Sequence, residues 1–160
     1  NIQYGFGLNL TYKKFDFGVF FNGSAKRKIM INEGYAPFQS GGGDGHSGQT
    51  LPTNLMQWIA DGHWSVDNPN PNAVYPRLGT TISDIQNNIV KSSFWMRNAN
   101  FLRFKTLEFG YRFPHCRVYF NGDNLAVFSP FKLWDPELNT DNGASYPNTT
   151  SYSVGINFTF

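Results

Sequence analysis

The last ten residues of the chain, Ser151 to Phe160, alternate strictly between apolar and polar side chains. Every second residue from Tyr152 to Phe160 is aromatic or aliphatic, and the residues between them are serine, glycine, asparagine or threonine. Successive side chains of a β-strand point to opposite faces of the sheet. The pattern therefore predicts a strand with one apolar and one polar face. About ten such residues are enough to cross a bilayer within a β-barrel.

Four further stretches alternate in the same way, and each predicts a strand. The first two are separated only by Lys13-Lys14, so they are expected to form a β-hairpin. A soluble β-sandwich also contains half-buried strands with this alternation, so the pattern of single strands leaves both architectures open. The four stretches are residues 2–12, 15–22, 100–111 and 117–128.

Two places depart from regular alternation. Arg103 and Lys105 share the parity of the apolar residues between Leu107 and Tyr111. We expect these two cations to lie above the hydrocarbon or beyond a register change. In the next stretch, Gly122-Asp123-Asn124 is expected to form a bulge that switches the inward face.

The connections between the expected strands alternate between tight turns and long loops. Residues 13–14 and 113–116 form turns, whereas residues 23–99 and 129–150 form loops. Outer-membrane barrels sort their connections in this way, with short periplasmic turns and long extracellular loops. The arrangement therefore favours a transmembrane barrel over a sandwich. Within the first loop, the spacing of apolar residues over 54–62 predicts a short helix.

Composition narrows the possible functions. The aromatic content of 18% suits the aromatic girdles of a membrane barrel. A net charge of +2 without a basic patch argues against binding to nucleic acid. The single cysteine, Cys116, offers neither an intrachain disulfide framework nor a metal-ligand spacing. Paired carboxylates and clustered histidines are also missing from the sequence, so we expect no enzyme activity, no metal and no cofactor.

The start of the sequence does not read as a signal peptide, because Asn1 opens into a strand pattern without a charged or apolar leader. Five strands cannot close a barrel, and open edges in lipid would leave backbone groups unpaired. We therefore expect the chain to be the C-terminal part of a larger barrel, with the remaining strands supplied by the rest of the same protein.

The stretch from Ser92 to Tyr111 carries a tryptophan followed by a run of aromatic, aliphatic and basic residues that ends in Gly110-Tyr111. It resembles the block W…A-x-Y-L-R-L-K-N-L-x-L-G-Y of SusC/RagA-type TonB-dependent outer-membrane transporters, with Phe101 where Tyr is common and Phe104 where Leu is common. Motifs in family order cover the whole chain. They are Tyr12-Lys13-Lys14-Phe15-Asp16, Asn72 to Arg77, Val118 to Leu125, Asp135-Pro136-Glu137 and Tyr146-Pro147.

The resemblance implies a fold and a set of partners. It implies an all-β fold in which residues 1–160 are C-terminal antiparallel strands of a transmembrane barrel of about 22 strands, with long extracellular loops and an N-terminal plug domain outside this chain. Such a multi-pass protein of the bacterial outer membrane imports oligosaccharides or oligopeptides. Its partners would be a SusD-like surface lipoprotein that acts as a lid, the TonB complex contacted through the plug region, and outer-membrane lipid.

Four tryptophans in or beside the expected outer loops are candidates for contact with substrate or lid, because flat aromatic rings stack on sugars and anchor interfaces. Packing within the loops is the alternative for each. Three aromatic residues of the last strand resemble the signal that the barrel-insertion machinery reads, and lipid anchoring is their alternative. The tryptophans are Trp58, Trp64, Trp95 and Trp134, and the assembly residues are Tyr152, Phe158 and Phe160.

Two further alternatives concern a cation site and the class of protein. Asp135, Glu137 and Asp141 offer oxygen ligands for calcium, but their spacing is not that of an EF-hand. The rival to a transporter is a secreted all-β glycan-binding module that uses its loop tryptophans. A self-contained small barrel would need further strands within residues 23–99, where Gly, Pro and Asn are frequent.

Overall fold

The computed structural model describes residues 1–31, 57–79, 87–88, 90–138, 140 and 145–159, with the side chains of 58 and 59 excluded. The chain divides into two compact units. One consists of Asn1–Ile29 with Arg97–Phe160, and the other of Met30–Met96. Each unit is described by itself.

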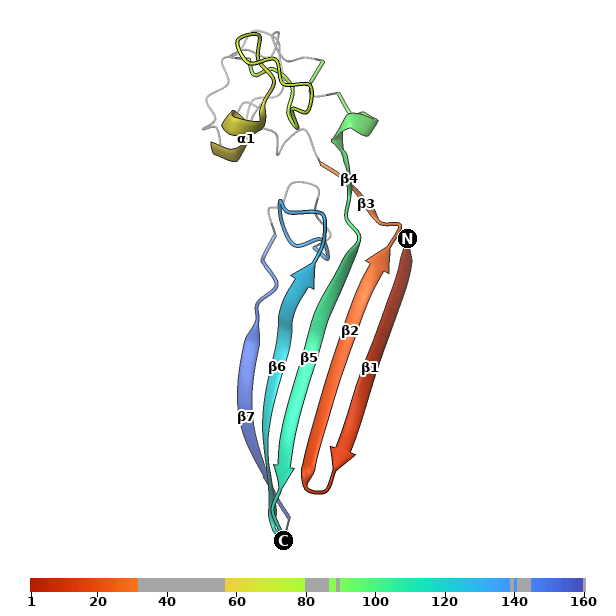
Figure 1. The fold of residues 1–160 in the computed structure, drawn as a ribbon, viewed down its shortest axis with the longest axis vertical. Helices are drawn as coiled ribbons and strands as arrows, with labels where there is room; N and C mark the ends of the chain where they lie inside the picture. Colours follow the sequence, from red (N-terminus) through yellow and green to blue (C-terminus); the bar gives the residue numbers. More distant parts are fainter. Residues whose placement is uncertain (32–56, 80–86, 89, 139, 141–144, 160) are drawn as a thin grey trace. The chain divides into compact units, whose positions relative to one another are not determined.

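The first unit contains a five-stranded antiparallel sheet in the order β1-β2-β5-β6-β7, so each strand pairs with its neighbours as a meander (Figure 1). Strand β2 continues three residues beyond the expected end at Asn22. The strands are β1 (Ile2–Tyr12), β2 (Phe15–Ala25), β5 (Phe101–Arg112), β6 (Cys116–Phe128) and β7 (Ser151–Phe158).

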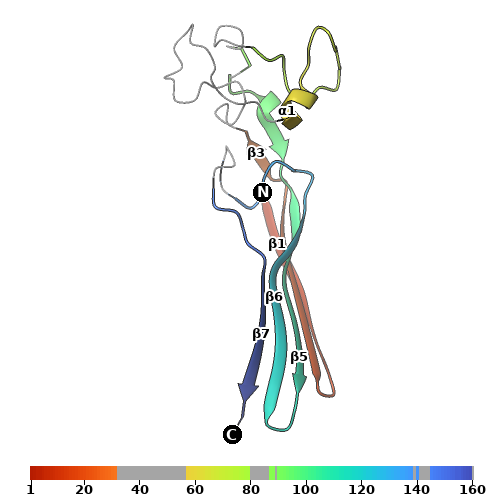
Figure 2. The same ribbon diagram turned by 90° about the vertical axis from the view of Figure 1, so that its left-hand side faces the viewer.

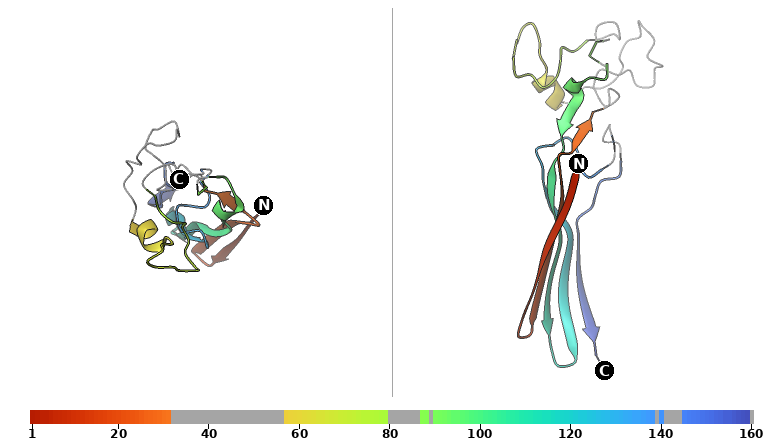
Figure 3. Two further views of the ribbon diagram at one scale, coloured as in Figure 1. Left: turned by 90° about the horizontal axis from the view of Figure 1, so that it is seen from above. Right: turned by 90° about the vertical axis from the view of Figure 1, so that its right-hand side faces the viewer.

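The sheet is twisted rather than flat, as the edge-on views show (Figures 2 and 3). Both tight turns lie at one end of it. Lys13 closes the first turn with a φ of 54°, and the amide of Phe113 donates to the carbonyl of Cys116 at 2.7 Å in the second. The amide of Thr159 donates to the carbonyl of His115 at 3.0 Å, which places the end of β7 beside that turn.

The register separates an apolar face from a polar face. Directly opposed residues of antiparallel strands share a face, and Phe6 pairs with Phe21, which pairs with Phe104. Their rings stack across three strands with centroid distances of 5.3 and 4.8 Å. The apolar face comprises Ile2, Tyr4, Phe6, Leu8, Leu10, Tyr12, Phe15, Phe17, Val19, Phe21, Leu102, Phe104, Leu107, Phe109, Tyr111, Val118, Phe120, Ala126, Phe128, Tyr152, Val154, Ile156 and Phe158.

The expected register change lies at Lys105. Phe20 pairs with Thr106 but Phe21 pairs with Phe104, so Lys105 is an extra residue in β5. This bulge reverses the parity of β5 and moves Arg103 to the polar face. One of the two expectations for Arg103, a position beyond a register change, is therefore confirmed.

The expected bulge in β6 is present, but its predicted effect is wrong. Thr106 pairs with Asp123 and Phe104 with Ala126, which leaves Asn124 and Leu125 as extra residues, with Asn124 at a φ of 57°. Two extra residues preserve parity, so the even-numbered residues of β6 stay on the apolar face. The switch of face therefore occurs in β5, where a single residue is inserted.

Glycines give large side chains room on both faces. A Cβ at Gly23 would lie 2.5 Å from Tyr4 Oη and from the Phe101 carbonyl oxygen, to which the Tyr4 hydroxyl donates at 3.0 Å. A Cβ at Gly155 would collide with the ring of Tyr119 on the polar face. Each glycine lets an aromatic ring from the neighbouring strand lie over the backbone, which fixes strand register.

A small core lies at the loop end of the first unit. Ile29, Ala99 and Phe131 are buried there, with Leu133 and Trp134 packed against them. The amide of Ala99 donates to the carbonyl of Arg27 at 3.0 Å. This core ties the residues that follow β2, precede β5 and follow β6 into one structure.

The second unit has little regular structure in its described part. The helix α1 (Gln57–Gly62) falls within the range expected to be helical, whose first residues 54–56 lie outside the described residues. A short 3-10 helix, η2, spans Ser93–Trp95. Strands β3 (Lys28–Met30) and β4 (Met96–Asn98), of which only Met30 and Met96 belong to the second unit, pair in a separate two-stranded ladder. The described helices include none that is both long enough and apolar enough to cross a membrane.

Candidate functional site

The apolar face of the five-stranded sheet is open to its surroundings. Phe6, Leu8 and Ile156 are each more than half exposed, at 55%, 51% and 55%, and Val154 reaches 73%. Soluble proteins rarely leave such a broad apolar surface in contact with water, and exposed surfaces of this kind mark contact with a membrane or with another protein. The face therefore fits contact with lipid.

Aromatic rings gather on this face at the turn end. Phe15 and Tyr111 meet edge to face at 4.8 Å, and Tyr111 meets Phe113 at 4.7 Å. The Lys13 ammonium lies 5.3 Å from the Tyr12 ring centroid. Aromatic rings with a cation beside them are typical of the boundary between hydrocarbon and headgroups.

The polar face carries a cluster of charges across three strands. Arg117 of β6 donates from Nε to Asp16 Oδ1 of β2 at 3.1 Å, and from Nη2 to Glu108 Oε1 of β5 at 2.5 Å. Gly110 makes room for the cluster, since a Cβ there would lie 2.6 Å from Asp16 Oδ2. Arg112 Nε also lies 3.6 Å from Asp16 Oδ1 as an ion pair, so two cations balance two carboxylates on the polar face.

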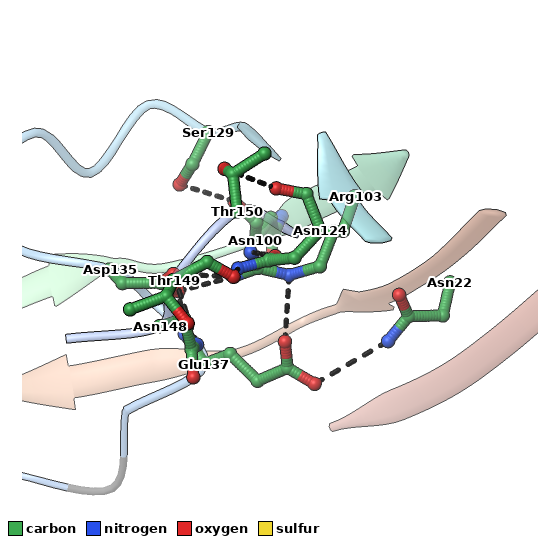
Figure 4. A network of polar contacts seen from close by, with 10 residues as sticks. All are labelled: Asn22, Asn100, Arg103, Asn124, Ser129, Asp135, Glu137, Asn148, Thr149 and Thr150. Carbon is green, nitrogen blue, oxygen red and sulfur yellow. Dashed lines mark hydrogen bonds and ion pairs between the residues drawn. The ribbon is translucent and has the colours of Figure 1, made fainter. Parts of the chain in front are cut away.

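A second network centres on Arg103, whose side chain is only 2% exposed (Figure 4). Its Nη2 donates to both carboxylate oxygens of Asp135, at 2.5 and 2.6 Å. Its Nε lies 2.7 Å from Glu137 Oε2 as an ion pair, and its Nη1 donates to the side-chain oxygen of Asn124. One buried cation thus holds two acidic residues of the segment that follows β6.

Amide and hydroxyl groups extend this network to its neighbours (Figure 4). Asn22 Nδ2 donates to Glu137 Oε1 at 3.4 Å, and Asn148 Nδ2 donates to Asp135 Oδ2 at 3.1 Å. Asn124 also donates to the Thr149 carbonyl at 2.9 Å. The network therefore connects β2, β5 and β6 to both ends of the segment 129–150.

Burial and hydrogen bonding act in opposite directions on the pKa of Asp135. Burial raises the pKa, but hydrogen bonds from Arg103, the Glu137 amide and Asn148 outweigh it and hold the pKa below its ordinary value. Asp135 is therefore a carboxylate. The guanidinium of Arg103 occupies the place among these oxygens that a cation would take, and Asp141 lies outside the described residues.

The structure places the candidate tryptophans in different environments. Trp95 is 2% exposed, and its indole N–H donates to the Asn88 carbonyl at 2.8 Å. Trp134 is half-buried and packs edge to face on Phe131 at 4.9 Å. Trp64 is half-buried, and its amide donates to the Tyr75 carbonyl at 2.9 Å. Trp58 lies in α1, with its side chain outside the described part.

Two of the three candidate assembly residues, Tyr152 and Phe158, lie on the apolar face of β7. Tyr152 and Phe158 are 66% and 65% exposed. Phe160 lies outside the described residues.

The Arg103 network was not predicted as a site. Two signals could have found it: a cation that breaks the apolar parity of a strand, and an Asp-Pro-Glu motif downstream that carries two carboxylates. Joining them requires knowledge that Lys105 is inserted in the strand, and sequence alternation alone does not supply it.

Comparison with known proteins shows which barrels the chain is similar to. No family model matches the sequence. The chain is 27% identical to TonB-dependent receptor P3 of Formosa agariphila over 98% of its length, and 26% identical to TonB-dependent receptor P26 of the same organism over 100%. The RagAB peptide importer in its open-open state aligns over 99% of the chain, with a TM-score of 0.71 and 25% identity. The chain is similar to TonB-dependent receptors from end to end.

The chain spans only a small part of the length of the proteins it is similar to. It spans 16% and 17% of the two receptors' lengths, and 17% of the chain aligned in the open-open importer. The closed-closed importer aligns with a TM-score of 0.66 and 26% identity. The predicted resemblance to SusC/RagA-type receptors and the predicted all-β class are confirmed, and the chain is a fragment of an antiparallel β-barrel.

Proposed function

We propose that this chain forms part of the barrel of a TonB-dependent importer in the bacterial outer membrane. The observation that carries the proposal is the exposed apolar face, five strands wide, opposite a face of polar side chains and glycines. Similarity to TonB-dependent receptors along the whole chain supports it.

In this proposal the two faces of the sheet contact different surroundings. The apolar face contacts lipid, while the polar face lines the lumen and contacts the plug domain. The unpaired edges of β1 and β7 bind the remaining strands of the same protein, because a free edge in lipid would leave N–H and C=O groups without partners. The tight turns face the periplasm and the long loops face outward.

The protein imports oligopeptides or oligosaccharides and works with a SusD-like surface lipoprotein. The RagAB neighbours, described as a peptide importer, support the peptide alternative. The loop 23–99 would line the vestibule and contact the lid, with Trp58, Trp64, Trp95 and Trp134 as candidate contacts. Tyr152, Phe158 and Phe160 would carry the assembly signal. The protein has a transport role and no catalytic one.

The test uses the full-length protein in the bacterium that produces it. Cells with and without a functional TonB complex are incubated with fluorescent oligopeptide and oligosaccharide pools, and the tagged protein is purified from detergent-solubilised membranes. We expect the protein in the outer membrane, a copurifying SusD-like lipoprotein, and uptake of one pool that stops without TonB.

Two results would contradict the proposal. Uptake of both pools that is unaffected by loss of TonB would remove the energy-coupled role. A protein recovered from the medium as a detergent-free monomer would favour the alternative, a secreted glycan-binding module.

A further inference from the structure

We propose that a hollow on the polar face, at the loop end of β1 and β2, binds a carboxylate group of the transported solute. This inference rests on the proposed function, because that function makes the polar face the wall of the import path. The hollow has a volume of about 490 Å³. It is named here the Ser24 hollow, and its principal lining residues are Gln3, Phe20, Asn22, Ser24, Arg27 and Phe101.

The Ser24 hollow arises from the order of small and large residues along paired strands. On the polar face Gln3 lies opposite Ser24, and Gly5 lies opposite Asn22. Glycine and serine leave space there that the bulkier Phe20 and Phe101 bound. The hollow is therefore a feature of the sheet itself.

Three polar atoms at the Ser24 hollow are buried and have neither a hydrogen-bond partner nor an ion-pair partner among the described residues. They are the hydroxyl of Ser24, the side-chain oxygen of Asn22 and the Nε of Arg27. Ser24 as a whole is only 2% exposed. Native proteins seldom leave buried polar groups unsatisfied, because each has lost its hydrogen bonds to water. The three atoms therefore indicate an occupant that supplies both donors and an acceptor.

The charges at the hollow specify an anionic acceptor. Within the described part of the chain, Arg27 takes part in no ion pair. The nearest acid in the hollow, Glu137, already binds the guanidinium of Arg103 at 2.7 Å and accepts from Asn22 at 3.4 Å. Among the described residues, the positive charge of Arg27 therefore has no ion-pair partner.

The backbone of Arg27 is held in place on both sides. Its amide donates to Asn100 Oδ1 at 2.8 Å, and its carbonyl accepts from the Ala99 amide at 3.0 Å. The base of the side chain is therefore fixed beside the hollow. A guanidinium and a hydroxyl together form charge-assisted hydrogen bonds to a carboxylate.

The side-chain oxygen of Asn22 is an acceptor, so the solute must also carry a hydrogen-bond donor close to its carboxylate. Two classes of solute have this arrangement. In an oligopeptide the carboxylate stands beside an amide N–H, and in an acidic oligosaccharide a uronate stands beside hydroxyl groups. The shared chemistry is a carboxylate with an adjacent donor.

The test measures binding to the full-length protein, purified with any lipoprotein that accompanies it. Two carboxylate pools are used, a tryptic digest of casein and a mixture of oligogalacturonates, each also in methyl-esterified form. Ser24→Ala and Arg27→Gln are compared with Ser153→Ala and Lys26→Gln. Ser153 is a serine of the same face on β7, and Lys26 is an exposed cation beside Arg27.

We expect one of the two pools to bind, which identifies the source of the carboxylate, and its methyl esters to bind at least about tenfold more weakly. Ser24→Ala and Arg27→Gln should weaken binding of the free acid by a similar factor, while both controls keep wild-type affinity.

Several results would overturn the inference. They are equal binding of acid and ester, wild-type affinity in both hollow variants, or binding of neither pool to the wild-type protein. Lowered thermal stability of the hollow variants with unchanged affinity would also overturn it, because the occupant would then be another part of the same protein. TonB-dependent uptake by the wild-type cells separates these outcomes from a failure of the proposed function.

Discussion

The guanidinium of Arg103 and the carboxylate of Asp135 face each other across the polar side of the sheet, with Nη2 2.5 and 2.6 Å from the two carboxylate oxygens. Arg103 belongs to β5, and Asp135 belongs to the segment that follows β6. The two side chains are 2% and 16% exposed, so the pair is largely out of water. Removing one partner leaves the other buried without its counter-charge.

Loss of Arg103 should release the segment 129–150. We expect Arg103→Met to destabilise the packing of this segment by about 3–5 kcal/mol, the usual cost of breaking a buried ion pair. Limited proteolysis of the full-length protein in outer-membrane vesicles measures the rate of cleavage within the segment. Arg112→Met is the control, because Arg112 is 59% exposed and an exposed pair contributes about 0–1 kcal/mol. Equal cleavage rates in the two variants would show that the network does not hold the segment.

The same segment should loosen in acid. The pKa of Asp135 is lowered in the folded protein, whereas an unfolded Asp titrates near about 3.9. Its contribution to stability is therefore complete above that value and is lost as the pH falls through the lowered folded pKa. Trp134, which packs on Phe131 at 4.9 Å, reports the change by fluorescence.

Lowering the pH from about 7 to about 2 covers the range in which carboxyl groups become protonated. The fluorescence of Trp134 should show a transition below about pH 4. Trp134→Phe removes the reporter and supplies the background. Asp135→Asn should be looser at neutral pH and should lose the transition. An unchanged transition in Asp135→Asn would assign it to another carboxyl group.

A new positive charge should destabilise the folded protein much more on the apolar face of β1 than on its polar face. Leu8 lies on the apolar face and is 51% exposed, whereas Asn9 lies on the polar face opposite Gly18. Leu8→Arg should cost about 2–4 kcal/mol if it lies near the bilayer midplane, and Asn9→Arg should cost far less. Quantities of folded protein in the outer membrane, read as a heat-modifiable gel band, measure the difference. A larger loss with Asn9→Arg would reverse the assignment of the faces.

Gly155 should not tolerate a side chain while Tyr119 covers it. A Cβ at position 155 collides with the Tyr119 ring, which also lies 4.9 Å below the Arg117 guanidinium. Gly155→Ala should destabilise the barrel by about 1–3 kcal/mol, the typical cost of overpacking. The temperature at which the heat-modifiable band disappears measures this. Gly155→Ala combined with Tyr119→Leu should recover most of the loss, and strict additivity would contradict a direct contact.

The proposed assembly signal makes a separate prediction. Phe160→Ala should lower the amount of full-length protein in the outer membrane without changing its synthesis. Ile156→Ala, on the apolar face of β7, is the control for loss of lipid contact. Quantitative immunoblots of outer-membrane and whole-cell fractions measure both. Wild-type surface levels in Phe160→Ala would count against the assembly role.

The alternation of side chains was sufficient to predict most of the sheet, because a strand places successive residues on opposite faces whatever its partners are. The shared apolar parity within each strand, as in Leu8 and Leu10 of β1 or Val154 and Ile156 of β7, follows from this period of two alone. The order of tight turns and long loops likewise depends only on positions along the chain. Local rules therefore determined the all-β class, the positions of the strands and the two faces of each strand that has no inserted residue.

Only the tertiary structure decided where Arg103 points, which tryptophans are buried, and which small residues leave the Ser24 hollow. The position of Arg103 and the Ser24 hollow depend on contacts between residues far apart in the sequence, such as Arg103 with Asp135 or Ser24 with Phe101. One inserted residue, Lys105, reverses the face of every residue before it in β5. Alternation of side chains is a property of a single strand, but register describes how two strands pair. The register can therefore be determined only when the positions of both strands are known.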